Sequence, residues 1–158
     1  MRNAKLLLAL ALAGGIGGIL GIGVFTFGYA EGWSYLSNDP RACTNCHIMD
    51  PQFDAWQKSS HHTVAVCNDC HLPHAFVPKW IAKARNGFNH GWAFTFQDFH
   101  EPIQITKPNA EILQHACIDC HGALVHPLLE SAAAAEDVVQ CVHCHLDVGH
   151  GARAGLGR

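Results

Sequence analysis

All eight cysteines of this 158-residue chain fall into one short pattern. They form four C-x-x-C pairs, and a histidine directly follows each pair: C-T-N-C-H from residue 43, C-N-D-C-H from 67, C-I-D-C-H from 117 and C-V-H-C-H from 141. In an exported chain this pattern is typical of haem c, which is held by two thioethers and an axial imidazole. A redox dithiol or a zinc site does not require a histidine after every second cysteine. The sequence therefore predicts four covalently bound haem c groups, attached at Cys43, Cys46, Cys67, Cys70, Cys117, Cys120, Cys141 and Cys144.

The N-terminal segment is apolar. No charged residue occurs from Leu6 to Tyr29, and a run of that length can cross the hydrocarbon core of a bilayer as a helix. Arg2 and Lys5 precede it, so we expect the N-terminus in the cytoplasm and the rest exported. A cleaved signal peptide is the alternative, but the run is longer than a signal h-region. The expected organisation in the inner membrane is a cytoplasmic segment at 1–5, a single-pass anchor at 6–29 and a periplasmic tetrahaem domain at 30–158.

The spacing of the motifs suggests an internal repeat. The first and second cysteine pairs are separated by 24 residues, as are the third and fourth, which suggests two dihaem modules at about 41–75 and 115–151. Four haems in so short a chain must themselves form the core, because little polypeptide is left to build one. We therefore expect a mainly α fold with much irregular structure, made of one transmembrane helix and a small haem-cored multihaem cytochrome c domain.

The best candidate for a long helix outside the anchor runs from Pro78 to Phe94. Proline is favoured at a helix start, and apolar residues recur at helical spacing. These apolar residues are Trp80, Ile81, Ala84, Phe88 and Trp92, with Lys79, Lys83 and Arg85 between them. The helix could pack on haem edges with a solvated basic side, or lie on the membrane surface as an amphipathic helix. Both interpretations stay open.

Met49 lies two residues after the histidine of the first motif. The Cα atoms of His47 and Met49 can be separated by about 7 Å at most. Ligands on opposite sides of one iron, each with its Cα about 5 to 6 Å from the metal, would need a larger separation. Both side chains therefore approach from one haem face. Either His47 is the ligand and Met49 packs, or Met49 replaces His47 and leaves the far face open to a substrate.

The pattern as a whole is similar to a known family. The shared features are the single anchor, the four spaced motifs, C-H-x-M at 46–49, S-S-H at 59–61, K-A-R at 83–85 and V-G-H-G at 148–151. In these features the chain resembles the NapC/NirT family of membrane-anchored cytochrome c quinol dehydrogenases. Within that family it resembles the small subunits of cytochrome c nitrite reductase complexes, over essentially its full length.

The resemblance implies a function. It implies oxidation of menaquinol and transfer of the electrons to a periplasmic, ammonia-forming multihaem nitrite reductase, an NrfA-like catalytic subunit, with no nitrite chemistry in this chain. The alternative is a tethered tetrahaem electron carrier that feeds a different periplasmic reductase.

The motifs and the resemblance together imply an axial ligand set. The motif histidines His71, His121 and His145 are the expected proximal ligands of haems 2, 3 and 4. In the family, the methionine of C-H-x-M ligates haem 1, which implies that role for Met49, with His47 as the alternative.

The resemblance also implies distal ligands. It implies His61 and His150, which we pair with haem 4 and haem 3 respectively, and His62 is an adjacent rival for His61. In the family haem 2 can be completed by a lysine of the bound reductase. His90 is the internal competitor for that position.

A quinol site requires particular groups. A quinol gives up two electrons and two protons, whereas a haem accepts one electron and no proton, so a proton acceptor is needed beside a haem edge. Haem 1 follows the anchor in sequence and is the expected entry point. Lys79 and Lys83 could orient the quinol oxygens. Family members carry Asp where Asn86 stands, and Asn cannot ionise, so Asp98, His90 or water is expected to take the proton.

Charge and helix surface limit the partners. The formal net charge is −3 at pH 7, which disfavours nucleic-acid binding and leaves membrane lipid, menaquinol and the reductase as expected partners. Gly14 with Gly18, and Gly17 with Gly21, have the G-x-x-x-G spacing that lets a second membrane helix approach closely. A higher-order hetero-oligomer is therefore possible.

Overall fold

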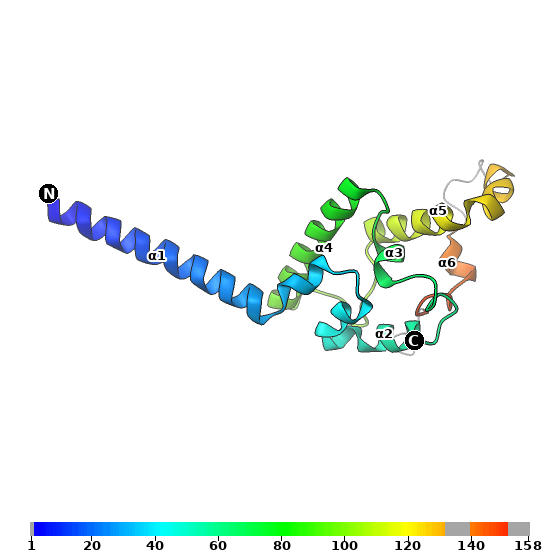
Figure 1. Ribbon diagram of the computed structural model, residues 1–158, viewed down its shortest axis with the longest axis horizontal. Coiled ribbons are helices and arrows are strands. Elements are labelled where there is room, and N and C mark those ends of the chain that lie inside the picture. Colours follow the sequence, from blue (N-terminus) through cyan, green and yellow to red (C-terminus); the bar gives the residue numbers. More distant parts are fainter. Residues whose placement is uncertain (1, 132–139, 152–158) are drawn as a thin grey trace. The chain divides into compact units, whose positions relative to one another are not determined.

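The computed structural model describes residues 2–131 and 140–151. Met1, residues 132–139 and residues 152–158 lie outside the described residues. Three predicted regions are therefore only partly covered: the cytoplasmic segment, the second dihaem module and the C-terminal end of the periplasmic domain. The described residues form helices and connecting segments without a β-strand (Figure 1). This confirms the prediction of a mainly α fold with much irregular structure.

The first of two compact units, Met1–Ser37, holds one long helix. Helix α1 runs from Arg2 to Tyr29, and Figure 1 shows it as a single continuous rod. Within the span Asn3–Tyr29 the mean hydropathy reaches 2.2 and no residue is buried. By length and composition this helix can cross a membrane, as the sequence predicted.

Helix α1 ends in an aromatic turn. Glu31 has a left-handed backbone with φ of 51°, and the 3₁₀-helix η1 (Gly32–Leu36) follows. A Cβ atom at Gly32 would lie 2.4 Å from the ring of Phe27, so a glycine is needed for this close approach. The Phe27 ring meets the edge of Trp33, with ring centres 5.0 Å apart. Aromatic residues are enriched where a membrane helix leaves the hydrocarbon core.

The second unit, Asn38–Arg158, is built from shorter helices. They are η2 (Pro40–Asn45), η3 (His47–Met49), α2 (Asp50–Trp56), α3 (Cys67–His71), α4 (Phe76–Phe96), α5 (Lys107–Ser131) and α6 (Cys141–Cys144). Helix α2 packs beside η2, α3 packs against α5, and α5 packs against α6. The helices that carry the second, third and fourth cysteine motifs are therefore neighbours along α5.

Side-chain hydrogen bonds join these motif-bearing helices. The ring of His74 lies 2.9 Å from the carbonyl oxygen of Asp69 through Nε2, and 3.2 Å from the Asp119 carboxylate through Nδ1. This ring connects the end of α3 to α5. The Gln114 side chain on α5 accepts a hydrogen bond of 2.9 Å from the backbone N–H of Cys141. It thereby satisfies a free N–H at the first turn of α6.

The polypeptide buries very little of itself. Among the described residues the buried hydrophobic side chains are Leu72, Ala82 and Ala116, and the buried charged one is Lys83. These three hydrophobic residues are small or medium in size, whereas burying one large apolar side chain contributes only about 1.5–3 kcal/mol. A core this small cannot hold a domain of this length. The burial pattern therefore agrees with the expectation that haem groups supply the core.

The long helix predicted at 78–94 is present as α4 and extends two residues further at each end. Gln97, with φ of 54°, ends it. Its apolar side chains are not covered by the described polypeptide, since Ile81 is 63% and Phe88 69% exposed. Lys83 is only 6% exposed. Within the polypeptide, α4 thus turns its apolar row outward and a lysine inward.

Candidate haem and quinol sites

Three of the four motifs share one local geometry. The cysteine pairs of the second, third and fourth motifs lie within α3, α5 and α6. Residues three apart on an α-helix lie on the same face, so both thiols of a pair can reach one haem. The histidine that follows lies at or just beyond the same turn. This arrangement suits two thioether bonds and one axial ligand to a single haem.

The first motif has a different backbone. Cys43 lies in the 3₁₀-helix η2, and Cys46 is an extended residue (φ −102°, ψ 108°) between η2 and η3. The side chain of His47 is 98% exposed and lies 3.7 Å from the Asp50 carboxylate. Met49, at the end of η3, is half-buried. Of the two candidate ligands of haem 1, Met49 is thus the less exposed.

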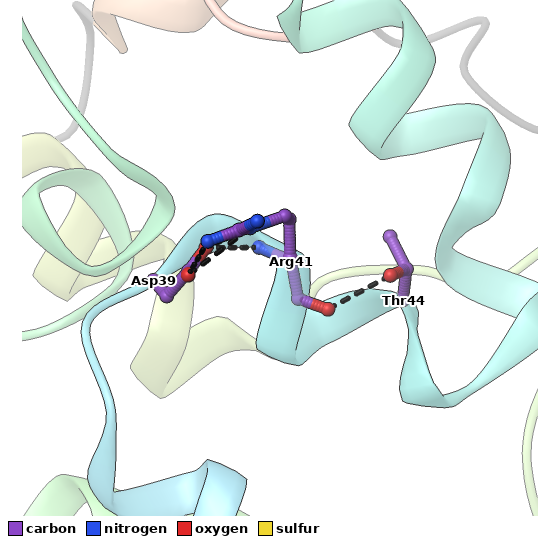
Figure 2. Close-up of polar contacts among 3 residues, drawn as sticks. All are labelled: Asp39, Arg41 and Thr44. Carbon is purple, nitrogen blue, oxygen red and sulfur yellow. Dashed lines mark hydrogen bonds and ion pairs between the residues drawn. The ribbon is translucent and has the colours of Figure 1, made fainter.

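An exposed ion pair fixes the turn that carries Cys43 (Figure 2). The Asp39 carboxylate accepts a hydrogen bond from the backbone N–H of Arg41 at 2.9 Å and others from its guanidinium at 2.6 to 3.1 Å. The Thr44 hydroxyl donates to the carbonyl oxygen of Arg41 at 2.8 Å. The hydrogen bonds from Arg41 lower the pKa of Asp39. Asp39 is therefore the N-cap of η2 and keeps its charge there.

The cysteines of successive motifs lie close to one another. The thiols of Cys43 and Cys67 form a hydrogen bond, which lowers the pKa of Cys43 to about 7. Burial, with the nearby sulfurs of Cys141 and Cys70, raises the pKa of Cys117. The attachment sites therefore follow one another in space in the order of the sequence.

Two pairs of histidine rings lie close together. The rings of His61 and His121 have centres 6.0 Å apart and an interplanar angle of 69°. The rings of His71 and His150 have centres 5.8 Å apart and an angle of 9°. Burial, with His150 beside it, lowers the pKa of His71 to about 4, which favours the neutral imidazole that binds metals. The sequence pairing predicted His61 at haem 4, beside His145, and His150 at haem 3, beside His121. In the structure His61 lies beside His121, and His150 lies beside His71.

The other histidine candidates have different surroundings. The ring of His62 packs edge-on against Trp56, with ring centres 4.9 Å apart, while the indole N–H of Trp56 donates to the carbonyl oxygen of Ala65 at 3.1 Å. His90 is exposed on α4 and His145 is exposed after α6. No ring contact in the described part of the chain places an imidazole opposite His145.

The predicted quinol-site residues of α4 share one face. Residues 79, 83, 86 and 90 have the spacing of successive turns. Nζ of Lys83 lies 5.4 Å from the centre of the Trp80 ring. Burial and, to a smaller extent, the charge of Lys79 lower the pKa of Lys83. Cys43 lies close enough to raise that pKa. The structure therefore brings Lys83 beside the attachment site of haem 1.

The two remaining quinol-site candidates have different positions. The Asn86 side-chain oxygen accepts a hydrogen bond of 3.3 Å from Asn109 on α5, so Asn86 helps to hold α4 against α5. Asp98 follows the end of α4 and is exposed, and its backbone N–H donates to Ala93 at 3.0 Å. Neither observation brings Asp98 to the face that carries Lys83.

Sequence reasoning did not find a shallow apolar hollow on α4. It has a volume of about 540 Å³ and is lined by Phe76, Val77, Trp80, Ile81 and Ala84. The helical periodicity identified the last three. Phe76 and Val77 precede Pro78, at which the helix was predicted to begin, so they were left outside it. The hollow and the buried Lys83 meet at Trp80.

These donors fit haem c better than a bare metal ion. A structural zinc site needs about four clustered ligands, and nowhere in residues 2–131 or 140–151 do three His, Cys, Asp or Glu side chains gather in that way. The cysteine pairs on single helical turns, and the imidazoles that face the motif histidines, suit a large planar group between the helices.

Comparison with known proteins gives consistent matches. Residues 1–116 match the NapC/NirT cytochrome c family, N-terminal region. The chain is 42% identical over 143 residues to the cytochrome c-type protein NrfH of Wolinella succinogenes, over 84% of this chain and 80% of that protein. It is 30% identical over 149 residues to the cytochrome c nitrite reductase subunit NrfH of Nitratidesulfovibrio vulgaris, over 94% and 87%. The solved structure of the cytochrome c nitrite reductase NrfHA complex bound to the HQNO inhibitor matches with a TM-score of 0.62 and 27% identity, over 90% of each chain.

Replacing Asp39 with Ala should loosen the turn that carries Cys43, because it removes the N-cap and the partner of Arg41. We expect a lower Tm and a smaller fraction of protein with a full set of haems by mass spectrometry. Because the pKa of Asp39 is lowered in the folded state, its contribution is complete above the unfolded pKa and is lost as the pH falls through the folded pKa. The difference in Tm between the unmodified protein and the Asp39→Ala variant should therefore become smaller as the pH falls. The exposed Asp54 is the matched control, and an equal effect of Asp54→Ala would contradict the assigned role.

Replacing Met49 with Leu tests the ligand of haem 1. We expect the methionine-to-iron absorption feature to disappear while all haems stay attached, because the thioether is removed and the cysteines are not. The change His47→Ala, by contrast, should leave that feature in place. The reverse result, with an altered spectrum only in His47→Ala, would make Met49 a packing residue.

Proposed function

We propose that this chain, which belongs to the NapC/NirT cytochrome c family, oxidises menaquinol at the membrane and passes the electrons to a periplasmic, ammonia-forming nitrite reductase. On this proposal it is a single-pass protein with four haem c groups and its haem domain in the periplasm. The observation that carries the proposal is the position of Lys83. This buried cation lies between Trp80 at the apolar hollow and the first cysteine motif.

The residues around Lys83 match the needs of quinol oxidation. Haem c, when bound, accepts one electron at a time at its exposed edge. The quinol must also lose its protons, and a lysine with a lowered pKa is more often a neutral amine that can accept one. Lys79, one turn away, can orient the second quinol oxygen. Asn86 is engaged with Asn109 and serves to hold α4 in place.

The outward row of α4 supports a position at the membrane surface. Phe76 is 75% exposed and Trp92 is 54% exposed, and an apolar row with cations on another face is typical of an interfacial helix. A lipid-soluble quinol would then meet the hollow without leaving the bilayer. Protons passed from Lys83 could reach water through the exposed His90 or Asp98.

The proposed partner is an NrfA-like catalytic subunit. Two supports are the names of the relatives from Nitratidesulfovibrio vulgaris and of the NrfHA complex. The family resemblance offers a lysine of that partner as the distal ligand of haem 2. The ring of His150, whose centre lies 5.8 Å from that of His71, supports His150 as an internal alternative. A larger hetero-oligomer of both subunits is also part of this proposal.

A second candidate is a tethered tetrahaem carrier that serves a different reductase. The chain is also 28% identical over 166 residues to the cytochrome c-type protein NapC of Escherichia coli K12, over 89% of this chain and 80% of that protein. Both candidates use the same entry site. They differ in which soluble protein takes the electrons.

Replacing Lys83 with Met should slow haem reduction by a menaquinol analogue by about a hundredfold, the usual scale for loss of a general base. Reduction by dithionite should be unchanged, because that reductant needs no quinol site. In the unmodified protein the quinol rate should rise with pH up to the lowered pKa of Lys83, because the neutral amine is the active form. Lys83→Arg keeps the charge but cannot give up its proton, so it should be slow and lack this pH dependence.

Arg85→Met is the control for the Lys83 variants, because Arg85 is an exposed cation two residues away. An equal loss with menaquinol and dithionite would indicate a folding defect. Unchanged quinol rates in Lys83→Met would exclude Lys83 as the proton acceptor.

Purification from native membranes in mild detergent should bring down a multihaem nitrite reductase together with this chain, because the anchor must hold its partner at the membrane. Mass spectrometry of the purified material checks this. Recovery with a different reductase, and none with a nitrite reductase, would favour the second candidate.

A further inference from the structure

The ring of His74 joins the second and third cysteine motifs at corresponding positions. Nε2 lies 2.9 Å from the backbone carbonyl oxygen of Asp69, and Nδ1 lies 3.2 Å from the carboxylate of Asp119. In C-N-D-C-H and in C-I-D-C-H, each of these aspartates directly precedes the second cysteine. The ring therefore bridges the expected attachment sites of haem 2 and haem 3.

Both partners of this ring are hydrogen-bond acceptors. A carbonyl oxygen and a carboxylate have no hydrogen to donate, so each bond requires an N–H group of the ring. A neutral imidazole has one N–H group, and an imidazolium has two. The geometry at His74 is therefore complete only for the imidazolium, which places a positive charge between the two motifs.

The other ionisable groups near this bridge, apart from the motif cysteines, lie on α3 and α5. On α3 the carboxylate of Asp69 accepts a hydrogen bond of 2.9 Å from the backbone N–H of Val66, and His71 is neutral because burial lowers its pKa to about 4. On α5, His115 lies one turn before Asp119 on the same face. Asp119 is the one among them whose charged atoms are bonded to the bridging ring.

Side-chain bonds also join the other consecutive motifs, but these bonds are uncharged. Nδ2 of Asn68, within the second motif, donates to Oδ1 of Asn38, two residues before η2, at 2.9 Å. The bond from the backbone of Cys141 to Gln114 joins α6 to α5, also at 2.9 Å. Consecutive motifs are therefore joined by polar bridges, and of these three bridges only the middle one can gain or lose a proton.

The middle bridge restricts a distance and adds a charge. The side chains of His74 and Asp119 are 38% and 56% exposed, so their ion pair adds little stability on its own. It does restrict how far α3 can move along α5, and electron transfer between two haems slows steeply as the gap between their edges widens. A positive charge beside a haem also stabilises the reduced form, which carries one positive charge fewer, and so raises the potential.

We propose that His74 is a positioning residue for the electron step between haem 2 and haem 3, acting as an imidazolium that bridges α3 and α5. In this step one electron passes from haem 2 to haem 3, and no atom is transferred. Protonation of His74 completes the bridge and raises the potentials of both haems, so the step depends on pH. This inference rests on the proposed function only in requiring bound haem at these two motifs and electron transfer between them.

The test is a redox titration of the full-length holoprotein, purified alone in detergent, at a series of pH values. In the unmodified protein two haem potentials should fall as the pH rises, because the ring loses its positive charge. His74→Ala should lower these two potentials at low pH and remove that part of their pH dependence. His74→Arg keeps a charge that cannot be lost, so it should keep the higher potentials at every pH.

EPR of the oxidised protein measures the effect on position. The magnetic interaction between haem 2 and haem 3 should change in His74→Ala, because α3 is released from α5. Asp119→Ala should give the same change, and the double variant should add nothing further, because both residues act through one bond. The matched control is Gln114→Ala, which breaks the uncharged bridge between α5 and α6 and should leave the pH dependence of the potentials in place.

Two outcomes would overturn the role of His74. The proposal is wrong if His74→Ala keeps the potentials and the pH dependence of the unmodified protein. It is also wrong if Gln114→Ala removes that dependence to the same extent, because a general loosening of the domain would then be the cause. Where His74→Ala fails to retain its haems, His74→Arg decides, since an unchanged pH dependence in that variant cannot come from residue 74. None of these readouts uses menaquinol or a reductase, so a failed quinol assay would count against the proposed function alone.

Discussion

The arrangement of the helices depends on the C-x-x-C-H motifs, which in a member of a cytochrome c family hold haem covalently. The described polypeptide buries only three hydrophobic residues, of which Leu72 is the largest, so it has no core of its own to specify a unique arrangement. Its helices are instead placed where cysteine pairs must reach a flat apolar group. This explains why α3 and α6 are short, neither being longer than the motif that it carries, and why hydrogen bonds such as that from Cys141 to Gln114 join one motif-bearing helix to the next.

On the proposed function, that arrangement would also order the path of the electrons. Cys43 lies beside Cys67, and Cys117 lies near both Cys70 and Cys141, so attachment sites that are consecutive in the sequence are neighbours in space. A linear order has one end near the quinol candidates on α4 and the other at the C-terminal motif. On the proposed function, entry and exit would then be separated by the whole set of attachment sites, so that quinol and reductase would not compete for one surface.

Sequence reasoning succeeded where structure is local. The four motifs and the apolar anchor are recognised from spacing alone, and the helix at 78–94 follows from a proline start and helical periodicity. The distal ligands could not be assigned in this way. His61 and His121 are far apart in the chain and share no periodic pattern, so their approach depends on how α3 packs on α5. The burial of Lys83 was equally hidden, because its spacing fits a solvated basic face as well as an inward one.

The position of His145 bears on what the proposed partner must supply. In the described part of the chain no ring contact places an imidazole opposite this exposed histidine, whereas His71 and His121 each have a second imidazole nearby, with ring centres 5.8 and 6.0 Å apart. On the proposed function, the partner would contact the end of the electron path near His145. A surface contact at one end can vary between reductases while the entry site and the path stay unchanged. The chain is similar to proteins named both NrfH and NapC, and on the proposed function such a division would place the entry chemistry inside the chain and the choice of partner at its edge.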